Sequence, residues 1–562
     1  MKNQKQDILI QLLILFAGLF FFVPFLGNAF LFDWDELNFA EAAREMLASG
    51  NFLQVQINFQ PFWEKPPLFF WFQALSMSLF GVGEFAARFV NALAGVITLL
   101  AVYGIGKKIF DRTFGLLWAG AFLGSFLPHL FFKSGIIDPV FNLFIFLGIY
   151  FVYKSERTEG DETHAAPLAL AGVFLGLATL TKGPVAILIA VLCAGAYWAL
   201  GRFKPFLSVK GVAVCAAAAC AVSLAWYGIE TLAHGPWFIT EFIKYQFRLL
   251  TTGDAGHGRP FWFHFVVLLL GCFPASFLAI RSFLPSKADP DIQKRFTRWM
   301  LVLFWVVLIL FSIVRTKTVL YSSLCWFPIT YLAAYHMHAV ITGKFDWRRW
   351  LTLSLAVFGL IVALVIAAFP VVMMHTAWLI PLVKDPFARE CLTYPGHWSY
   401  WETGIGLGYA AALITAAVLA GRKRFAAGFA VLLLSTALCL QAAMILFVPN
   451  VENYAGAGPI RFYKSLQGKD VYAKSLFKSY ADLFYSRKQP GGNPKSYDVE
   501  WLLNGPIDKP AYFVCRIDKA PQYRKMAQLR EIKAEYGFVY FVREAAETLI
   551  GDEKNPFKKP GQ

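Results

Sequence analysis

Charged residues are scarce in this chain. Of its 562 residues, 16% are Asp, Glu, Lys or Arg, whereas 57% are apolar. Soluble globular proteins carry about 25% charged residues, so the composition excludes an ordinary soluble enzyme and indicates that lipid is the main solvent. Repeats and low-complexity tracts are also lacking. Collagen and a disordered chain are thereby excluded.

The sequence also lacks the glycine-rich loops that bind nucleotides. The nearest pattern, GVGEFA at residues 81–86, begins an apolar run and follows no expected strand, whereas Walker and Rossmann loops follow a strand. ATP-driven transport by this chain alone is therefore not expected. The eight cysteines include no CxxC pair, and six of them lie in apolar runs. Cys391 and Cys515 lie in polar segments, where a disulfide between them stays an open alternative.

Long apolar runs are what the chain has in place of charge. A bilayer core about 30 Å thick needs roughly 20 residues of helix, and shorter helices can span where neighbours shield them. The first run is not expected to be a cleaved signal peptide, because no small-residue cleavage site precedes Asp33. We expect thirteen membrane-spanning helices, at about residues 8–26, 86–105, 114–132, 138–153, 165–181, 184–200, 211–228, 261–281, 299–314, 319–338, 351–372, 404–420 and 425–447.

The net charge of +16 follows this topology. If the N-terminus, with Lys2 and Lys5, lies in the cytoplasm, the basic loops fall on the cytoplasmic side, as the positive-inside rule requires. The basic excess is therefore not evidence for nucleic-acid binding. Residues 66–82 form an extra apolar segment that is short and starts with two prolines. We expect it to be a helix at the outer membrane interface; the alternative is that it spans and another segment does not.

The composition becomes mixed and polar from residue 449. We therefore expect two domains: an all-α polytopic transmembrane domain over residues 1–448, with a periplasmic first loop over 27–85, and a small periplasmic α/β domain over 449–562. Strands are expected at 470–474, 511–516 and 536–542, with helices at 476–485 and 522–534.

The first outer loop is unusually acidic. In its segment DWDELNFAEAAREM (33–46), the first acidic residues precede an amphipathic helix that the rest of the segment is expected to form. Acidic residues that open a helix favour its dipole, but one cap does not require three carboxylates. Ionisable residues beside the membrane are functional candidates. The carboxylates are Asp33, Asp35, Glu36, Glu41 and Glu45.

Cations recur on the same expected face. Lys65 lies in WEKPPL beside two prolines, and single cations lie at the ends of later spans: Lys182, Arg248 and Lys317. Asp138 is an acid at the outer tip of two adjacent spans. Each lone cation at a span end could simply snorkel to the interface. Together, however, carboxylates and cations suit a reaction that removes a proton from one partner and leaves a phosphate on the other.

A sugar joined to a lipid phosphate is a donor that fits this set. Lys65, Arg248 and Lys182 could stabilise the departing phosphate. An acceptor hydroxyl must lose a proton as it attacks C1 of the sugar. Asp35 is our candidate for the base, with Glu36 or Asp138 orienting it or the sugar.

The motifs resemble a known family. Asp35-Glu36 followed by FAEAAREM, then WEKPPLFFW, Asp138, TKGP at 181–184 and KTVLYSSLCWFP at 317–328 look like the GT-C glycosyltransferases that depend on polyprenyl phosphate. Within that class the sequence is similar to the aminoarabinose (4-amino-4-deoxy-L-arabinose) transferase-like family, which modifies lipid A and is related to protein mannosyltransferases. The resemblance implies about 13 transmembrane helices and an outer C-terminal domain. It covers residues 8 to about 450.

The resemblance also implies residue roles. Asp35 is the essential acid, Lys65 and Arg248 contact the lipid phosphate, and Asp138, Lys182 and Tyr321 line the same cavity. Further cavity-lining candidates, which the resemblance does not itself imply, are Lys317, Asn38 and Phe39. The chain departs from the family pattern DE-P-R-Y-A-E, because Leu37, Asn38 and Phe39 follow Glu36. This chain therefore lacks the cation and the phenol that the family pattern has next to the site, so the identity of the sugar stays open.

No cofactor is required with certainty. Glu64 and His397 could form a two-residue site for a divalent metal, although two ligands are thin support. The expected function is an inverting transfer of aminoarabinose or a similar sugar from undecaprenyl phosphate to lipid A or a related envelope acceptor, at the periplasmic face of the bacterial inner membrane. A protein hydroxyl as acceptor, a lipid-linked sugar transporter or flippase, and a sensor with an external domain are the alternatives. The spans hold few ionisable residues, which disfavours transport.

Overall fold

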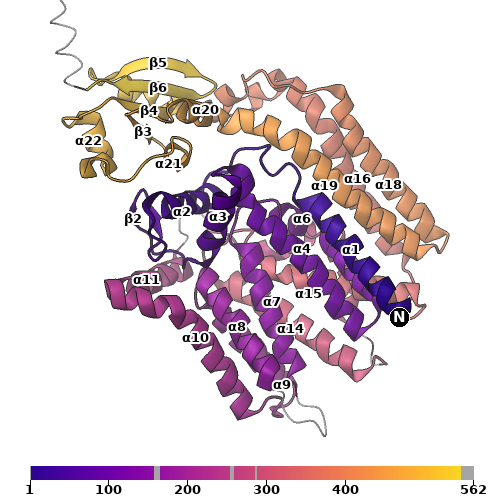
Figure 1. Ribbon diagram of the computed structural model, residues 1–562. Helices are drawn as coiled ribbons and strands as arrows, with labels where there is room; N and C mark the ends of the chain where they lie inside the picture. Colours follow the sequence, from indigo (N-terminus) through magenta and orange to yellow (C-terminus); the bar gives the residue numbers. More distant parts are fainter. Residues whose placement is uncertain (1, 157–164, 253–257, 285, 287, 546–562) are drawn as a thin grey trace, which may run out of the picture.

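The protein is mostly helical in the computed structural model, which describes residues 2–156, 165–252, 258–284, 286 and 288–545. The helices of its first half are α1 (Lys2–Phe22), α2 (Asp35–Ser49), α3 (Leu68–Phe80), α4 (Glu84–Ile109), α5 (Arg112–Leu123), α6 (Phe126–Phe131), α7 (Asp138–Lys154), α8 (Ala165–Lys182), α9 (Val185–Leu200), α10 (Val209–His234), α11 (Trp237–Thr251), α12 (Phe263–Gly271) and α13 (Ala275–Ala279). They form the bundle drawn from indigo to magenta in Figure 1.

The second half adds long helices and a small sheet. Its helices are α14 (Asp291–Ile313), α15 (Trp326–Ile341), α16 (Arg349–Met374), α17 (Pro386–Cys391), α18 (Thr403–Gly421), α19 (Phe425–Ala455), α20 (Ala457–Ser465), α21 (Ala481–Phe484), α22 (Val499–Asn504) and α23 (Ala520–Arg524). The strands are β1 (Gln56–Ile57) and β2 (Gln60–Pro61) in the first outer loop, then β3 (Tyr472–Ser475), β4 (Ala511–Arg516), β5 (Arg530–Glu535) and β6 (Phe538–Arg543).

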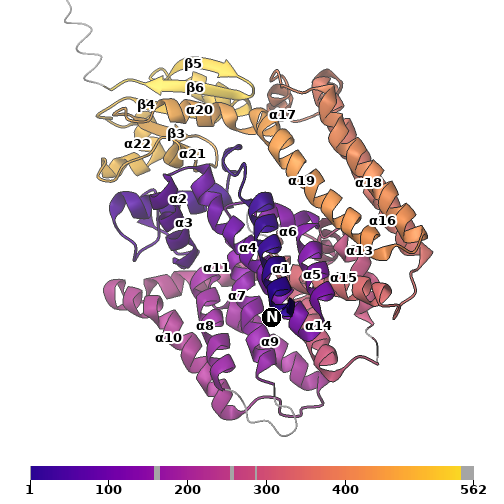
Figure 2. The same ribbon diagram turned by 45° about the vertical axis from the view of Figure 1, so that its right-hand side comes forward.

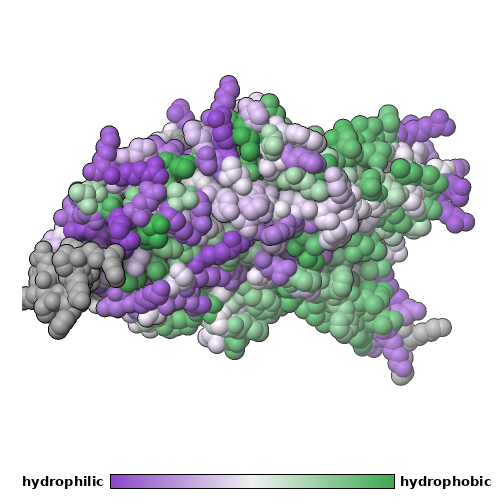
Figure 3. Space-filling view, turned by 90° about the horizontal axis from the view of Figure 1, so that it is seen from above, coloured by the Kyte–Doolittle hydropathy of each residue, from purple (hydrophilic) through white to green (hydrophobic). Residues whose placement is uncertain are grey.

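Within the described residues, eight helices are long and apolar enough to cross a membrane, or nine if one bent pair counts as a single span. The fold of a multi-span membrane protein is therefore confirmed, while the count of thirteen stays a prediction. Hydrophobic side chains cover much of the molecule on the right of Figure 3, and hydrophilic ones gather on the left and at the far tips. Charged side chains that face lipid have no water to solvate them, which explains why the chain has few charged and many apolar residues.

Two expected spans are not single straight helices. The run at 114–132 is divided into α5 and α6. The run at 261–281 bends by 105° between α12 and the helical segment Ala275–Phe283. Pro274 stands at the start of the second segment, where a missing backbone N–H costs no helical hydrogen bond.

The expected helix at 66–82 is present as α3. It packs against α2 and α4, and Phe69, Phe70 and Gln73 are buried. The Gln73 amide donates to the Ala87 and Gly135 carbonyls at 2.9 and 3.3 Å. These bonds fix the first outer loop to the bundle, and the position of α3 relative to the membrane stays a prediction.

A buried charge network holds α2 to the β1–β2 hairpin. The Arg44 guanidinium makes two hydrogen bonds of 2.7 Å to the Glu41 carboxylate. The Glu45 carboxylate accepts from the backbone N–H groups of Asn58 and Phe59 at 2.6 and 2.7 Å. Burial and the adjacent Glu41 raise the pKa of Glu45 to about 9. These two acids of the predicted cluster therefore support the loop.

The C-terminal sheet has the order β3-β4-β6-β5, with β3 parallel to β4 and the other pairs antiparallel. The three expected strands are present, and the expected helix at 476–485 is reduced to α21. The expected helix at 522–534 is wrong, because this stretch holds α23 and the edge strand β5. Tyr536 and Gly537 adopt left-handed φ values of 47° and 85°. They turn the chain so that β5 pairs with β6.

The C-terminal part lies on the first outer loop (Figures 1 and 2). The Leu31 backbone N–H donates to the Tyr485 hydroxyl at 2.8 Å. The Lys488 ammonium donates to Asn58 Oδ1 at 2.6 Å, and Lys464 pairs with Glu84 at 3.0 Å. A domain boundary near 448 stays a prediction, because α19 continues to Ala455 before the sheet begins.

The disulfide alternative is not supported. Cys391 and Cys515 are both free and buried. The Cys391 thiol instead contacts the Tyr536 carbonyl at 3.6 Å.

Candidate active site

Asp35 is the first residue of α2. The residue before it, Trp34, has φ 79°, an unusual conformation for a residue other than glycine. Asp33 lies on the other side of Trp34 and accepts a 2.7 Å hydrogen bond from the Ser479 hydroxyl. Asp33 is therefore bound to the C-terminal part of the chain.

The electrostatic surroundings of Asp35 identify its neighbours. Asp35 is an exposed residue. The protein groups that surround it beyond direct contact still reduce its solvation, and this desolvation raises its pKa. Lys65 and Lys182 oppose the shift, whereas Asp138 and Glu64 add to it. The five charged groups therefore lie close enough to influence one another's protonation. A carboxylate with a raised pKa is a better proton acceptor than an ordinary one.

Asp138 and Lys182 form an ion pair between α7 and α8. Lys182 Nζ lies 2.5 Å from Asp138 Oδ1, and the Asp138 side chain is 3% exposed. The same ammonium lies 5.6 Å from the ring centres of Tyr321 and Phe141. The structure thus brings Asp138, Lys182 and Tyr321 together, from three separate segments.

Lys65 and Arg248 share one aromatic ring. Lys65 Nζ lies 5.3 Å from the centre of the Tyr245 ring, and the Arg248 guanidinium lies 5.2 Å from it. Burial and the nearby Lys182 lower the pKa of Lys65, while Glu64 opposes that shift. Two cations that contact one ring can both approach an anion bound beside it.

The Glu36 carboxylate is hydrogen-bonded on both oxygens to other groups of the protein. Its carboxylate receives two 2.8 Å hydrogen bonds from the Arg88 guanidinium. It also accepts from the backbone N–H groups of Phe32 and Gly135. Since Glu36 is 2% exposed, this arrangement favours a role in positioning the start of α2 over direct contact with a sugar.

The remaining cavity-lining candidates differ in their surroundings. Phe39 is 2% exposed and packs against the rings of Phe69 and Phe70 at 6.0 and 5.7 Å, as a core side chain does. Asn38 is buried, and its Oδ1 has no hydrogen-bond partner among the described residues. Lys317 is 4% exposed and donates to the Val314 carbonyl at 2.5 Å. Their roles stay predictions.

The two metal candidates occupy different surroundings. Glu64 belongs to the charged group around Asp35, whereas His397 is exposed and its carbonyl accepts from the Asn450 amide at 3.2 Å. The described part of the chain holds no group of three or more His, Cys, Asp or Glu side chains that could hold a metal. The metal pair stays a prediction.

Sequence reasoning missed Tyr245 and residues 478–480 of the C-terminal part of the chain. Tyr245 stands three positions before Arg248, a spacing that places both on one helical face. Lys478 Nζ lies 3.6 Å from the Trp34 ring centre. Glu64 and Asp35, with Asp482, contribute to raising the pKa of Tyr480, although desolvation is the larger cause. No local pattern indicates that residues 478–480 meet residues 33–35.

Comparisons with known proteins agree with this geometry. A family model described as dolichyl-phosphate-mannose-protein mannosyltransferase matches residues 64–226. Two curated relatives are undecaprenyl phosphate-alpha-4-amino-4-deoxy-L-arabinose arabinosyl transferases. The one from Edwardsiella ictaluri is 29% identical, with 59% of this chain and 60% of the relative covered. The one from Pectobacterium carotovorum is 28% identical, with 64% of each covered. The chain thus spans less than two thirds of these relatives' length.

The fold also has a solved counterpart. The crystal structure of ArnT from Cupriavidus metallidurans bound to undecaprenyl phosphate matches with a TM-score of 0.76 and 17% identity, over 96% of this chain and 97% of that one. Its apo form matches with a TM-score of 0.72. The chain is therefore a multi-span membrane protein with the GT-C fold of ArnT, and the predicted resemblance to aminoarabinose transferases related to protein mannosyltransferases is confirmed.

Proposed function

We propose that the chain is an inverting glycosyltransferase. It moves aminoarabinose, or a similar sugar, from undecaprenyl phosphate to lipid A or a related envelope acceptor. The observation that carries the proposal is that Lys65 acts electrostatically on Asp35, whose pKa is raised, and shares the Tyr245 ring with Arg248. The names of the relatives supply the sugar and the lipid carrier.

The reaction is a single displacement at C1 of the sugar. The acceptor oxygen attacks C1, and the hydroxyl proton passes to the Asp35 carboxylate. The bond between C1 and the phosphate oxygen breaks, and undecaprenyl phosphate leaves with the bonding electrons. Lys65 and Arg248 stabilise the negative charge that develops on this phosphate. Attack opposite the leaving group inverts the configuration at C1.

Asp138 and Glu36 act through their neighbours in this mechanism. Asp138 holds the Lys182 ammonium at 2.5 Å and thus sets where that positive charge lies. Glu36 ties the start of α2 to Arg88 and Gly135. Both are positioning residues, and the metal site at Glu64 and His397 stays a prediction.

The proposed location follows from the topology of the helices. The N-terminus lies in the cytoplasm, and the chain crosses the bacterial inner membrane several times. The C-terminal domain lies in the periplasm, on the same side as α2 and Lys65. Its contacts with the first outer loop support this placement, because Ser479 and Lys488 bind Asp33 and Asn58.

Transfer by purified protein tests the proposal. The full chain in nanodiscs receives undecaprenyl-phosphate-linked aminoarabinose and lipid A, and mass spectrometry follows both lipids. We expect sugar-modified lipid A and free undecaprenyl phosphate in equal amounts. Asp35→Asn should abolish transfer, while the matched control Asp33→Asn, two residues away, should retain it. Movement of the lipid-linked sugar across the bilayer without covalent transfer would refute the enzyme and favour a transporter.

A protein acceptor is the second candidate, because the family model that matches residues 64–226 describes protein mannosyltransferases. The donor half of the reaction is unchanged in that case. Comparison of envelope lipids and envelope proteins by mass spectrometry, from cells with and without the chain, separates the two acceptors. Loss of a sugar from proteins alone would favour this candidate.

A further inference from the structure

The Asp35 carboxylate has no side-chain partner of its own. Within the residues that the structure describes it forms no hydrogen bond and no ion pair, although Lys65 and Lys182 act on it through space. The direction of this carboxylate therefore depends on the backbone that carries it. A general base must lie within hydrogen-bond reach of the hydroxyl that it deprotonates, so whatever fixes this backbone also affects the reaction.

Trp34, the residue before Asp35, has a backbone conformation that needs support. Its φ of 79° and ψ of −116° lie in a region that residues other than glycine rarely adopt. Such a conformation costs free energy and persists only where the surrounding structure holds it. The Trp34 side chain is 46% exposed, so burial in the core does not supply the support.

A segment of the C-terminal part contacts both residues that precede Asp35. The Lys478 ammonium lies 3.6 Å from the centre of the Trp34 ring, well within the range of a cation–π contact. The Ser479 hydroxyl donates to Asp33 Oδ1 at 2.7 Å. Two consecutive residues from the far end of the chain thus hold two consecutive residues at the start of α2.

This segment is itself fixed. It connects β3 to α21, and α21 packs against α2 (Figures 1 and 2). On the β3 side, the Leu476 N–H donates to the Val514 carbonyl of β4 at 2.8 Å. On the α21 side, the Ser479 hydroxyl accepts from the Ala481 N–H at 3.1 Å. The segment therefore carries the position of the sheet to residues 33–35.

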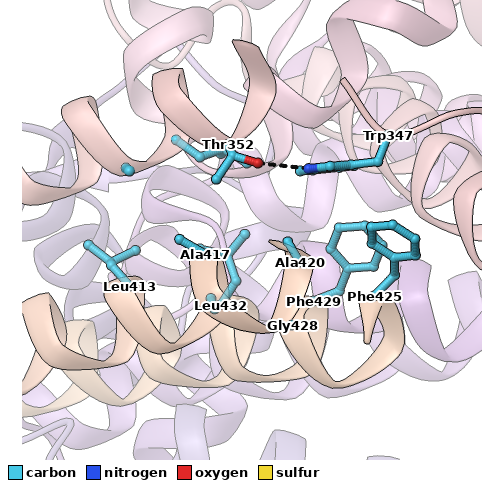
Figure 4. A pocket seen from close by; sticks show the side chains of 12 residues that line it. Trp347, Thr352, Leu413, Ala417, Ala420, Phe425, Gly428, Phe429 and Leu432 are labelled. Carbon is cyan, nitrogen blue, oxygen red and sulfur yellow. Dashed lines mark hydrogen bonds between the residues drawn. The ribbon is translucent and has the colours of Figure 1, made fainter. Parts of the chain in front are cut away.

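α19 joins the C-terminal part to the membrane bundle. Its start packs against α16 and α18 around an apolar hollow, which Figure 4 shows from close by. The Trp347 ring lies 5.9 and 5.5 Å from the Phe425 and Phe429 rings, and its indole N–H donates to Thr352 Oγ1 at 2.7 Å. α19 then continues to Ala455. The C-terminal part is thus anchored both in the bundle and on the first outer loop.

We propose that Lys478 and Ser479 are positioning residues for Asp35. They hold Trp34 and Asp33 in the conformation that directs the Asp35 carboxylate towards the acceptor hydroxyl. This role rests on the proposed function, and it gives the C-terminal part a purpose in that reaction without contact with the reacting atoms. Loss of both contacts frees the backbone before Asp35, and a displacement of about 1 Å can cost about 100-fold in rate.

Steady-state kinetics of the full chain in nanodiscs test this role, with the lipid-linked donor and lipid A. Lys478→Gln/Ser479→Ala should lower kcat about 10- to 100-fold and leave KM for the donor within about twofold, because the cations proposed to bind the phosphate are unchanged. Lys478→Arg/Ser479→Thr keeps a cation and a hydroxyl and should retain most of kcat. The matched control Lys469→Gln/Ser465→Ala alters two exposed residues of the same part of the chain, which have no described contact with residues 33–35, and should behave as wild type.

A second variant breaks the same hydrogen bond from the first outer loop. Asp33→Ala removes the acceptor of the Ser479 hydroxyl and leaves the Ser479 bond to α21 intact. It should lower kcat about as much as Ser479→Ala does, and the two substitutions together should cause little further loss, since they remove one interaction. Asp33→Asn keeps an acceptor oxygen and should not lower kcat.

Hydrogen exchange supplies a readout that does not need turnover. The Leu37 and Asn38 N–H groups donate to the Phe32 and Trp34 carbonyls at 3.2 and 2.7 Å. In the Gln/Ala double variant these amides should exchange faster than in the wild type and the control. If exchange is faster throughout the C-terminal part, that variant has unfolded locally, and Asp33→Ala decides the result.

Unchanged kcat in both the double variant and Asp33→Ala would overturn the proposal. So would a higher KM for the donor at unchanged kcat, which would indicate donor binding instead. Wild-type protein that transfers no sugar would refute the proposed function, and this role with it. Transfer by the wild type with equal kcat in the variants would refute this role alone.

Discussion

The Lys182 ammonium lies 2.5 Å from Asp138 Oδ1 and joins the end of α8 to the start of α7. The two side chains are unequally exposed, at 16% for Lys182 and 3% for Asp138. Removal of the partner is therefore more costly for Asp138, because a buried carboxylate without its cation loses water without compensation.

Lys182→Met should lower the free energy of unfolding by about 3 kcal/mol, the scale of a broken buried ion pair. Asp138→Asn should cost less, since Lys182 can still reach water. The double variant should recover part of the Lys182→Met loss. Unfolding of all four proteins in one detergent gives the coupling energy, and strictly additive losses would show that the pair is not coupled.

Asp35→Asn should lower turnover at least about 100-fold, as loss of a general base does. It should not lower stability at neutral pH. The folded-state pKa of Asp35 is raised, so its contribution to stability is greatest below the unfolded pKa and is lost as pH rises. In Asp35→Asn the side chain is a neutral amide at every pH, so the variant does not lose this stability as pH rises. Thermal unfolding and turnover measured together check the prediction; a variant that is inactive and also unstable would indicate a structural role.

Glu36→Gln should show the opposite pattern. It leaves the buried Arg88 guanidinium without its anion and should cost about 3–5 kcal/mol of stability. Turnover per folded molecule should fall much less than in Asp35→Asn. Activity normalised to folded protein, from size-exclusion chromatography, makes the comparison. A stable Glu36→Gln without activity would place Glu36 in the chemistry instead.

The Glu45 pKa of about 9 predicts how stability depends on pH. Its folded pKa is above the unfolded value near 4.5, so the stability that its protonated form contributes is complete below 4.5. That contribution is lost as pH rises towards and through 9. Glu45→Gln stays neutral and should flatten the decline. Unfolding midpoints between pH 5 and pH 10 test this, and parallel curves for wild type and variant would contradict it.

Arg248→Gln should lower kcat/KM for the lipid-linked donor by about 100-fold, since it removes one cation from the departing phosphate. Lys244→Gln is the matched control: Lys244 lies on the same helix, is exposed and pairs with Glu241 at 2.7 Å. It should have little effect. Similar losses in both variants would indicate that only the charge of α11 matters, for example in attraction to the membrane surface.

The sequence was sufficient for much of the helical framework. Leu68–Phe80 and Asp35–Ser49 are helices where the apolar and acidic patterns predict them. A helix forms its hydrogen bonds within one segment, so local residues decide it, and lipid leaves the backbone little alternative. The prediction of a helix at 522–534 fails for the converse reason, because β5 forms only through its pairing with β6.

What the sequence determined about this protein is its class, the course of its apolar helices and the kinds of charged residue beside them. Only the tertiary structure decided which charges meet. Glu36 and Asp35 are adjacent in sequence, yet their partners differ. Glu36 forms an ion pair with Arg88, whereas Asp35 lies in the charged group that contains Lys65. Residues 478–480 come to that group from the far end of the chain. Ion pairs and rings act through distance in space, and that distance is fixed only when separate segments pack.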